Sequence, residues 1–329
     1  MIRPSVSFIA WAPSAGRARD LAAELGGEYR CFYPQSLTSR RLVPLRYAAS
    51  SVGMAAYLVR RRPRAVVVQN PPVYPGLVAL AYARAVRGRF VLDAHPTAFG
   101  AKDNKQARMM IRWTRFLARH AAVVLVTTQQ WVNEVNSWGG TGLVVHEAPP
   151  EWSIATKSSP ADQRPRVLFV CVFASDEPVA EVLDAARQLP ELDIRITGDP
   201  SRAEPGLLAD LPTNVTLTGW LEFSDYAREV EAADIILALT TEPSSVQRAA
   251  YESVYARRVL VISDWSESRT LFPHATVTAN TTDSLAHTLR MAAEHLDELG
   301  AGVEDALQVQ KDRWSTQRQA LRAVLENQS

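Results

Sequence analysis

The chain of 329 residues is long enough for two α/β domains, and 47% of its residues are hydrophobic, as in ordinary globular proteins. Its two cysteines are too few for a disulfide-stapled scaffold, and no apolar run approaches the roughly 20 residues that span a bilayer. The net charge of +1 conceals two halves of opposite sign, with 20 Lys and Arg against 7 Asp and Glu in residues 1–150 and 16 against 28 in residues 151–329.

Residues 1–150 alternate apolar strands with amphipathic helices. Apolar runs predict strands at 6–11, 29–33, 65–69, 90–93 and 122–127. Helical periodicity predicts helices at 17–25, 45–62, 74–86, 105–120 and 129–138. Continuous apolar strands joined by helices indicate a parallel sheet that is covered on both faces. The apolar run near the start is interrupted by Arg3 and Pro4, unlike a secretory signal, so we expect a cytoplasmic protein.

The second half repeats this alternation. Residues 151–165 are rich in Pro, Ser and Ala and predict a linker. Strands are expected at 167–172, 193–197, 215–217, 235–239, 259–262 and 276–278. Helices are expected at 179–188, 224–232, 283–299 and 303–326, with a further helix that carries Gln247, Tyr251 and Glu252. We therefore predict a first domain at 1–150, a second at 166–302 and a C-terminal helix at 303–329.

The strongest functional signal is the polar loop from Thr240 to Ser245, between the strand 235–239 and the next helix. A strand, a tight polar loop and a helix start leave backbone N–H groups pointing outward, which favours an anion such as a diphosphate. The alternative is an ordinary crossover in which Ser244 or Ser245 only caps the helix. Gln247 and Glu252 on the first helical turns favour the binding site, because ligands bind at the carboxyl ends of parallel strands.

Asp93 and His95 form a second signal at the end of the strand 90–93. A single histidine is often structural, but this one lies at a strand's carboxyl end beside a proline. It could donate a hydrogen bond to a sugar hydroxyl or support a reacting group. We expect Asp93 and His95 to be the catalytic pair.

The helix 105–120 gives a third signal. Its arginines recur at offsets of 0, 4, 7 and 11 and therefore share one narrow stripe, which consists of Arg108, Arg112, Arg115 and Arg119. One interpretation is a surface helix whose apolar side packs on the domain. The other is an interfacial helix that contacts anionic lipid, and the basic first half favours such a partner.

Several common enzyme motifs are absent from the sequence. No GxxxxGK[ST], GxGxxG, HExxH or CxxC occurs, which argues against phosphate-loop ATPases, dehydrogenases and the common zinc enzymes. No Asp-x-Asp pair occurs either, so we expect no metal site and no resident cofactor. Helix starts and basic side chains would then neutralise a diphosphate.

A family resemblance spans nearly the whole chain. It is carried by RPRVLFVCVFASDEPVAEVLDAARQLPELDIRITGDP, TLTGWLEFSDYAREVEAADIILALTT and AAYESVYARRVLVISD. These stretches resemble the glycosyltransferases of GT-B type, especially those around family 4. In the first half, VVVQNPPVYPGLVALAYARAVRGRFVLDAHPTAFG also resembles the mannosyltransferases that extend chitobiosyl-diphosphodolichol. The resemblance implies an α/β fold of two Rossmann-like domains facing across a cleft. It also implies that the first domain takes the acceptor, the second takes a nucleotide-sugar, and the last helix returns to the first domain.

Individual positions match the pattern of that family. Glu252 matches the second Glu of its E-x7-E motif, which is expected on the ribose, and His95 matches a histidine near the donor sugar. The resemblance and the loop together predict a donor-binding set of Ser14, Gly16, Gly198, Gly219, Glu242, Ser244, Ser245, Gln247, Tyr251 and Glu252.

The sequence departs from the family at two places. Ser244 stands where the first motif Glu is expected, although Glu242 lies two residues earlier. The basic pair expected after the first strand of the second domain is replaced by Ala-Ser-Asp-Glu at 174–177. These departures bear on how the sugar is positioned and how the phosphates are neutralised.

We expect a metal-independent, hexosyltransferase-like glycosyltransferase that moves a sugar from a nucleoside diphosphate to an acceptor hydroxyl. The nucleotide-sugar is a co-substrate, and the acceptor is a glycan or a lipid-linked, anionic molecule. We expect the protein to act in the cytoplasm or at the inner face of the cell membrane, with no nucleic-acid partner. Two alternatives stay open: a nucleotide-sugar-binding protein of the same fold without transfer activity, and an epimerase that acts on the nucleotide-sugar alone.

Overall fold

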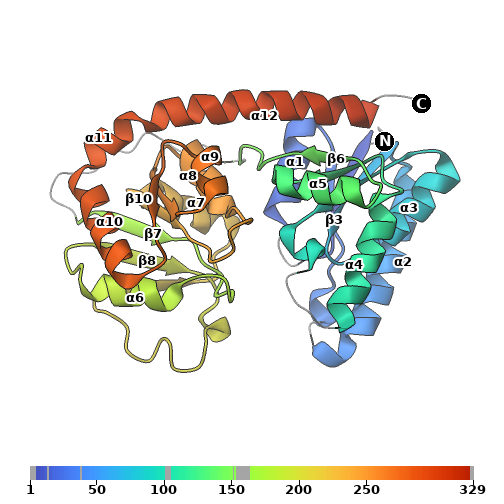
Figure 1. Ribbon diagram of the computed structural model, residues 1–329. Helices are drawn as coiled ribbons and strands as arrows, with labels where there is room; N and C mark the ends of the chain where they lie inside the picture. Colours follow the sequence, from blue (N-terminus) through green and yellow to red (C-terminus); the bar gives the residue numbers. More distant parts are fainter. Residues whose placement is uncertain are drawn as a thin grey trace. The chain divides into compact units, whose positions relative to one another are not determined.

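A computed structural model describes residues 5–12, 15–37, 39–100, 105–150, 152 and 164–326. The chain divides into two compact units (Figure 1). Unit 1 comprises residues 1–151 and 313–329, and unit 2 comprises residues 152–312. Most of the predicted linker, residues 151–165, lies outside the described ranges.

Unit 1 is built on a six-stranded parallel sheet with the strand order β2-β1-β3-β4-β5-β6. Its strands are β1 (Val6–Ala10), β2 (Glu28–Cys31), β3 (Ala65–Asn70), β4 (Arg89–Ala94), β5 (Val123–Val126) and β6 (Gly142–Val144). Its helices are α1 (Gly16–Leu25), α2 (Val43–Arg61), α3 (Tyr74–Val86), α4 (Lys105–Ala118) and α5 (Gln129–Ser137), with short 3₁₀ turns at Gln35–Leu37, Arg40–Leu42 and Pro96–Phe99.

The two faces of this sheet form separate cores because side chains alternate along each strand. In β3, Val66 and Val68 pack with α2, α3, α4 and α5, whereas Ala65 and Val67 pack on the other face with α1. That second core is completed by Trp314, Leu321 and Leu325 of the last helix, α12 (Val303–Glu326). Only the part of α12 from residue 313 onward belongs to unit 1.

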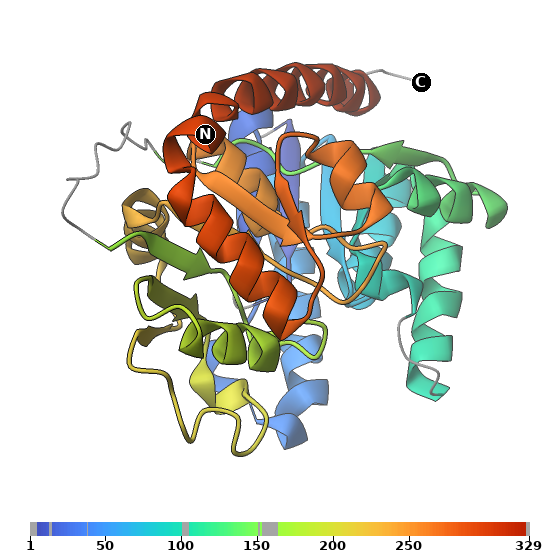
Figure 2. The same ribbon diagram turned by 60° about the vertical axis from the view of Figure 1, so that its left-hand side comes forward.

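Unit 2 has a second six-stranded parallel sheet, ordered β12-β11-β10-β7-β8-β9 (Figure 2). Its strands are β7 (Arg166–Phe169), β8 (Asp193–Thr197), β9 (Val215–Gly219), β10 (Ile235–Ala238), β11 (Val259–Ser263) and β12 (Thr276–Thr278). Its helices are α6 (Val179–Arg187), α7 (Phe223–Ala232), α8 (Arg248–Tyr255), α9 (Ser266–Leu271), α10 (Thr282–Glu294), α11 (Leu296–Ala301) and the start of α12, with a 3₁₀ turn at Pro200–Arg202. One face packs against α6 and α10, and the other packs against α8 and α9.

The two parallel, doubly covered sheets confirm the predicted α/β class with two Rossmann-like domains. Two details differ from the sequence-based expectation. The helix expected at 283–299 is interrupted at His295, whose φ of −116° and ψ of 30° are not helical, so α10 and α11 are separate. The structure also adds β6 and α9, which were not expected.

No helix in the described ranges combines the length and hydropathy needed to cross a lipid bilayer.

Candidate functional site

A buried cluster of charged side chains lies at the carboxyl edge of the unit 1 sheet. Arg17, in the first turn of α1, donates from Nε to both carboxylate oxygens of Asp93, at 3.0 and 3.1 Å. Its other nitrogens donate to Glu147 Oε1 and to the carbonyl oxygen of Val145, each at 2.8 Å. Burial alone lowers the pKa of Arg17, but the two carboxylates outweigh it and raise that pKa above its usual range. The guanidinium therefore stays charged and fixes Asp93.

His95 stands beside this cluster on the turn that follows β4. Its backbone N–H donates to the carbonyl oxygen of Asn70 at 2.9 Å, which ties the turn to the end of β3. Its Nε2 lies 3.8 Å from Asp93 Oδ2, a distance too long for a hydrogen bond. The side chain keeps 32% of its surface exposed, whereas that of Asp93 keeps 4%. The structure thus brings the two predicted catalytic residues together, with the imidazole partly exposed and its Nε2 atom buried toward Asp93.

His146 precedes Glu147 and is held as a neutral side chain. Its backbone N–H donates to Gln317 Oε1 at 2.8 Å, and its Nδ1 lies 3.1 Å from Gln317 Nε2. Burial, together with the positive charges of Arg313 and Arg17, lowers the pKa of His146 from 6.5 to about 3. A neutral ring can accept the amide hydrogen of Gln317 at Nδ1.

We expect the free energy of unfolding to decrease as the pH falls below 6.5, the ordinary pKa of His146. The unfolded chain takes up a proton there, whereas the folded chain resists protonation until a pH of about 3, so acid favours unfolding. The contribution approaches roughly 1.4 kcal/mol per pH unit in that window. Urea unfolding of the wild type and of His146→Asn, measured from neutral to mildly acidic pH, should give a smaller pH dependence for the variant. Equal dependences would contradict this role.

In unit 2, side chains from several elements fix the loop that follows β10. The Thr240 backbone N–H donates to Ser263 Oγ at 2.9 Å, and Thr240 Oγ1 donates to Asp176 Oδ2 at 2.9 Å. The Thr240 carbonyl oxygen accepts from Trp265 Nε1 and from Asn280 Nδ2, both at 2.9 Å. The start of the loop is therefore rigid.

The rest of this loop presents backbone donors. Within the described ranges, the N–H groups of Ser244, Val246 and Gln247 donate no hydrogen bond, although these residues are half-buried. Gln247 is the residue before α8, with an extended φ of −67° and ψ of 136°. The helix that was expected to carry Gln247 therefore starts one residue after it, because the backbone of Gln247 is extended. The Gln247 side chain donates from Nε2 to the Leu239 carbonyl oxygen at 3.3 Å. Unpaired N–H groups ahead of a helix suit an anionic ligand.

Glu252 lies inside α8 with two side-chain donors on its carboxylate. Tyr226 donates to Oε2 at 2.5 Å, and Arg248 donates from Nε to Oε1 at 2.7 Å. Burial and the Glu252 charge raise the pKa of Tyr226 well above its usual value, so the hydroxyl keeps its proton. A carboxylate offers about four acceptor positions, so Glu252 retains capacity for further donors. The sequence offered no signal for Tyr226, which lies 26 residues away on α7.

Tyr251 points into the core of unit 2. It is 1% exposed and its ring meets that of Phe272 edge-on, with the centroids 4.9 Å apart.

Gly198 and Gly219 meet at the carboxyl ends of β8 and β9. The Gly198 N–H donates to the Gly219 carbonyl oxygen at 3.1 Å. Gly198 has a φ of +100°, and a Cβ there would lie 2.6 Å from the Cys171 carbonyl oxygen, so this position requires glycine. Gly198 therefore packs closely against the chain that follows β7, whereas a Cβ at Gly219 would meet no atom within 4 Å.

The loop after β7, where a basic pair was expected, is held in place by the carboxylate of Glu177. The Glu177 carboxylate accepts from the N–H groups of Val172, at 3.0 Å to Oε2, and Ala174, at 2.8 Å. Phe173 between them has a φ of +56°. Such a curved run of N–H groups forms an anion-binding concavity, and here an internal carboxylate occupies it.

The remaining predicted residues fall outside these clusters. Ser14 lies outside the described ranges, Gly16 is the half-buried first residue of α1, and Glu242 is exposed on the loop after β10. Glu242 accepts from the Ser245 N–H at 3.1 Å through its backbone carbonyl. Among described residues, no group of three or more His, Cys, Asp or Glu side chains could hold a metal ion.

The four arginines of the stripe are all exposed, but they differ in their contacts. Arg115 lies over the ring of Trp138, 5.2 Å from its centroid, and Arg119 Nε donates to the Trp138 carbonyl oxygen at 2.6 Å. Arg108 and Arg112 extend from the half of α4 that carries the exposed Met109 and Trp113.

Comparisons with known proteins bear on both halves of the chain. Residues 5–149 match a family model described as "Glycosyl transferase 4-like domain", and residues 177–324 match one described as "Glycosyl transferase-like". A search of curated protein sequences gave no match.

Solved structures resemble the whole chain. The Anabaena protein Alr3699/HepE, solved in complex with UDP and glucose, is 14% identical with a TM-score of 0.72, covering 98% of this chain and 99% of that one. The sucrose-phosphate synthase from Thermosynechococcus elongatus is 14% identical with a TM-score of 0.69, covering 98% and 100%. A Rickettsia africae glycosyltransferase is 12% identical with a TM-score of 0.66, covering 99% and 100%. At such low identities these structures establish a shared fold.

Proposed function

Glycosyltransferase domains make up both halves of this chain of GT-B fold, and we propose that it transfers a hexose from a nucleoside diphosphate to an acceptor hydroxyl. The observation that carries the proposal is the fixed loop after β10, which presents the N–H groups of Ser244, Val246 and Gln247. In this proposal they hold the diphosphate, with Ser245 alongside and without a bound metal.

The other roles follow from each residue's surroundings. Glu252 accepts hydrogen bonds from the ribose hydroxyls with its remaining lone pairs. His95 donates to the reacting sugar, and Arg17 with Asp93 holds the turn that carries it. The nucleotide would lie at the edge of the sheet beside Gly219, where a Cβ would meet no protein atom within 4 Å.

The proposed transfer activity is tested by measuring whether the protein consumes a nucleotide-sugar when an acceptor is present. Purified protein is incubated with UDP-, GDP- or ADP-sugars and an acceptor, and release of the free nucleoside diphosphate is measured. A thermal-shift screen with the same nucleotides first identifies the base, since a bound ligand stabilises the folded state. Release that depends on the acceptor supports transfer, whereas no release with any donor and acceptor would contradict it.

A second candidate is a nucleotide-sugar-binding protein without transfer activity. Two observations favour it: Ser244 replaces a motif glutamate, and the Glu177 carboxylate occupies the loop where a basic pair would meet the phosphates. This candidate predicts a thermal shift with a nucleotide-sugar but no release of nucleoside diphosphate.

The acceptor we propose is a lipid-linked, anionic glycan. The excess of basic residues in the first half, with 20 Lys and Arg against 7 Asp and Glu, supports this proposal. The exposed part of α4 offers Arg108 and Arg112 to lipid phosphates and Met109 and Trp113, 48% and 42% exposed, to the acyl boundary. The protein would then lie on the inner face of the cell membrane.

For the donor site, we expect Glu252→Gln to weaken binding of the nucleoside diphosphate about 10- to 100-fold, because hydrogen bonds to a charged group contribute about 1.5–3 kcal/mol. Calorimetric titration measures the dissociation constant. Tyr226→Phe is the control, since it removes the internal bond to Glu252 and leaves the carboxylate in place. An equal loss in both variants would show that Glu252 acts only through packing.

A further inference from the structure

A large basic hollow lies at the amino-terminal edge of the unit 1 sheet, with a volume of about 1560 Å³. Its walls are the starts of β1, β3 and β4, the ends of α2 and α3, and the end of α12. Strand β4 runs from Arg89 in this hollow to Ala94 near the Asp93 cluster. At about 3.3 Å per residue, its end Cα atoms lie about 16 Å apart. The basic hollow is therefore separate from the proposed catalytic edge.

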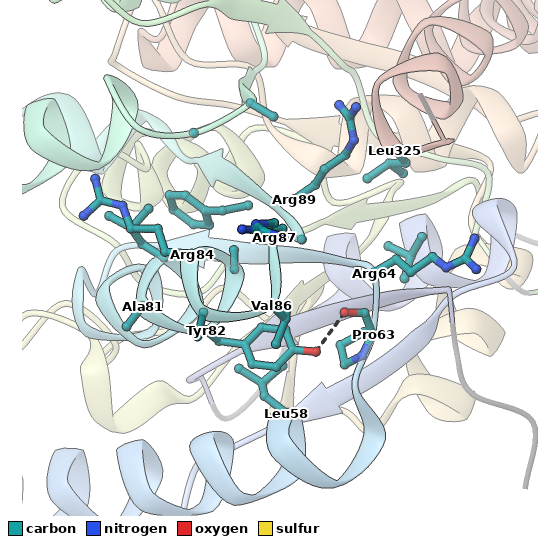
Figure 3. A pocket seen from close by; sticks show the side chains of 18 of the residues that line it. Leu58, Pro63, Arg64, Ala81, Tyr82, Arg84, Val86, Arg87, Arg89 and Leu325 are labelled. Atoms are coloured by element: carbon teal, nitrogen blue, oxygen red, sulfur yellow. Dashed lines mark hydrogen bonds between the residues drawn. The ribbon is translucent and has the colours of Figure 1, made fainter. Parts of the chain in front are cut away.

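The charged side chains that line the basic hollow are almost all positive. Seven arginines line it, against the single carboxylate of Glu326. Arg64, Arg84 and Arg87 are exposed, and none of them pairs with an acidic side chain in the described part of the chain. Figure 3 shows these three and Arg89 along the wall of the basic hollow, with the side chains of Arg84 and Arg64 pointing to opposite sides. Clustered like charges repel, and a bound anion relieves that repulsion.

The backbone beneath these arginines is rigid. The Arg64 N–H donates to the Ser5 carbonyl oxygen at 3.0 Å, and the Arg64 carbonyl oxygen accepts from the Arg89 N–H at 2.8 Å. The Tyr82 hydroxyl donates to the Pro63 carbonyl oxygen at 2.9 Å, as the dashed line in Figure 3 marks. Because the backbone is fixed, binding of a ligand would have to order only the side chains of these arginines.

Compensation of helix dipoles explains only part of this charge. Basic residues in the last turns of α2 and α3, such as Arg61 and Arg84, offset the negative helix ends. Arg62 and Arg87 instead follow those helices in left-handed conformations, with φ of 51° and 53°, where glycine is favoured. Arg257 follows α8 in the same conformation, but its charge is offset by an ion pair with Glu304, whose Oε2 lies 2.8 Å from Arg257 Nε. Dipole compensation also gives no reason for Arg64, which stands before β3.

We propose that the basic hollow binds a ligand that carries two or more phosphate groups, at a site distinct from the one that holds the sugar donor. Guanidinium groups make paired hydrogen bonds to phosphate oxygens, and the arginines spread along this hollow could each contact a different phosphate of one ligand. The volume exceeds the about 300–1,000 Å³ of a typical ligand pocket, which suits an extended, multiply charged molecule. The phosphates could belong to a free oligophosphate or to lipid headgroups, and the experiment separates these sources.

The test uses the full chain and two charge-matched double variants. Arg64→Gln/Arg87→Gln removes two arginines from the basic hollow, and Arg41→Gln/Arg164→Gln removes two exposed arginines that do not line it. Inorganic tripolyphosphate is titrated into each protein by calorimetry. Flotation with phosphatidylcholine vesicles that contain phosphatidylglycerol tests the lipid source. Circular dichroism confirms that each variant is folded.

We expect the Arg64/Arg87 variant to bind tripolyphosphate at least about tenfold more weakly than the wild type, and the Arg41/Arg164 variant to bind it as well as the wild type does. Loss of flotation by the Arg64/Arg87 variant with phosphate affinity unchanged would also support the site and assign it to lipid headgroups. If the Arg64/Arg87 variant matches the wild type in both assays, the proposal is overturned. These assays measure binding and not sugar transfer, so their results test the basic hollow even if the proposed transfer activity is contradicted.

Discussion

Replacing Arg17 by methionine should lower the free energy of unfolding by about 3–5 kcal/mol, the usual cost of leaving a buried charge without its partner. Arg17 is 6% exposed, and its guanidinium is the hydrogen-bond donor shared by the Asp93 and Glu147 carboxylates. Methionine fills a similar volume, so the expected loss is electrostatic rather than a cavity effect. Urea unfolding at neutral pH measures it.

Two further variants test whether the loss of stability in Arg17→Met comes from the buried carboxylates that it leaves without a partner. Arg112→Met removes an exposed arginine and should change the free energy of unfolding by less than about 0.5 kcal/mol. Arg17→Met combined with Asp93→Asn and Glu147→Gln should recover part of the loss, because it leaves no buried charge. If the triple variant is less stable than Arg17→Met alone, the buried carboxylates are not the source of the destabilisation.

Replacing His95 by alanine should lower kcat roughly 10²- to 10³-fold, comparable to the loss of one transition-state hydrogen-bond donor elsewhere. The imidazole stands at the accessible edge of the Asp93 cluster and is 32% exposed. Its removal should therefore affect transfer more than folding. Steady-state rates of nucleoside diphosphate release, with the acceptor saturating, measure the effect once the donor is known.

The control for this prediction is His295→Ala, which removes an exposed histidine between α10 and α11. It should leave kcat unchanged. Donor affinity of His95→Ala should stay within about threefold of the wild type if the imidazole acts mainly in the transition state. An unchanged kcat in His95→Ala would remove His95 from the catalytic role.

The architecture was predictable because it depends on local patterns. The run from Ala65 to Asn70 is apolar almost throughout, as strands covered on both faces must be, and the same holds for Val259–Ser263. At Gly198 the carbonyl oxygen of Cys171 lies 2.6 Å from where a Cβ would stand, so the position requires glycine. The glycine in the sequence therefore indicates this close approach. Such signals lie within a few residues of the feature they predict.

The contacts of the site were not predictable because they join distant residues. Arg17 meets Asp93 and Glu147 across 76 and 130 positions, and nothing near Arg17 distinguishes it from other arginines. Tyr251 was grouped with Glu252 as a ligand contact, yet neighbours on a helix point about 100° apart. The structure directs Tyr251 to Phe272 and Glu252 to Tyr226 and Arg248.

The discontinuity of unit 1 bears on how the protein is made. Domains generally fold in the order in which the ribosome releases them. Here residues 1–151 emerge first, yet one core of that unit also needs Trp314, Leu321 and Leu325. α1 covers part of that face early, but the part that these three side chains cover stays exposed until residues 314–325 have been made, so unit 1 is completed only after unit 2 has been synthesised.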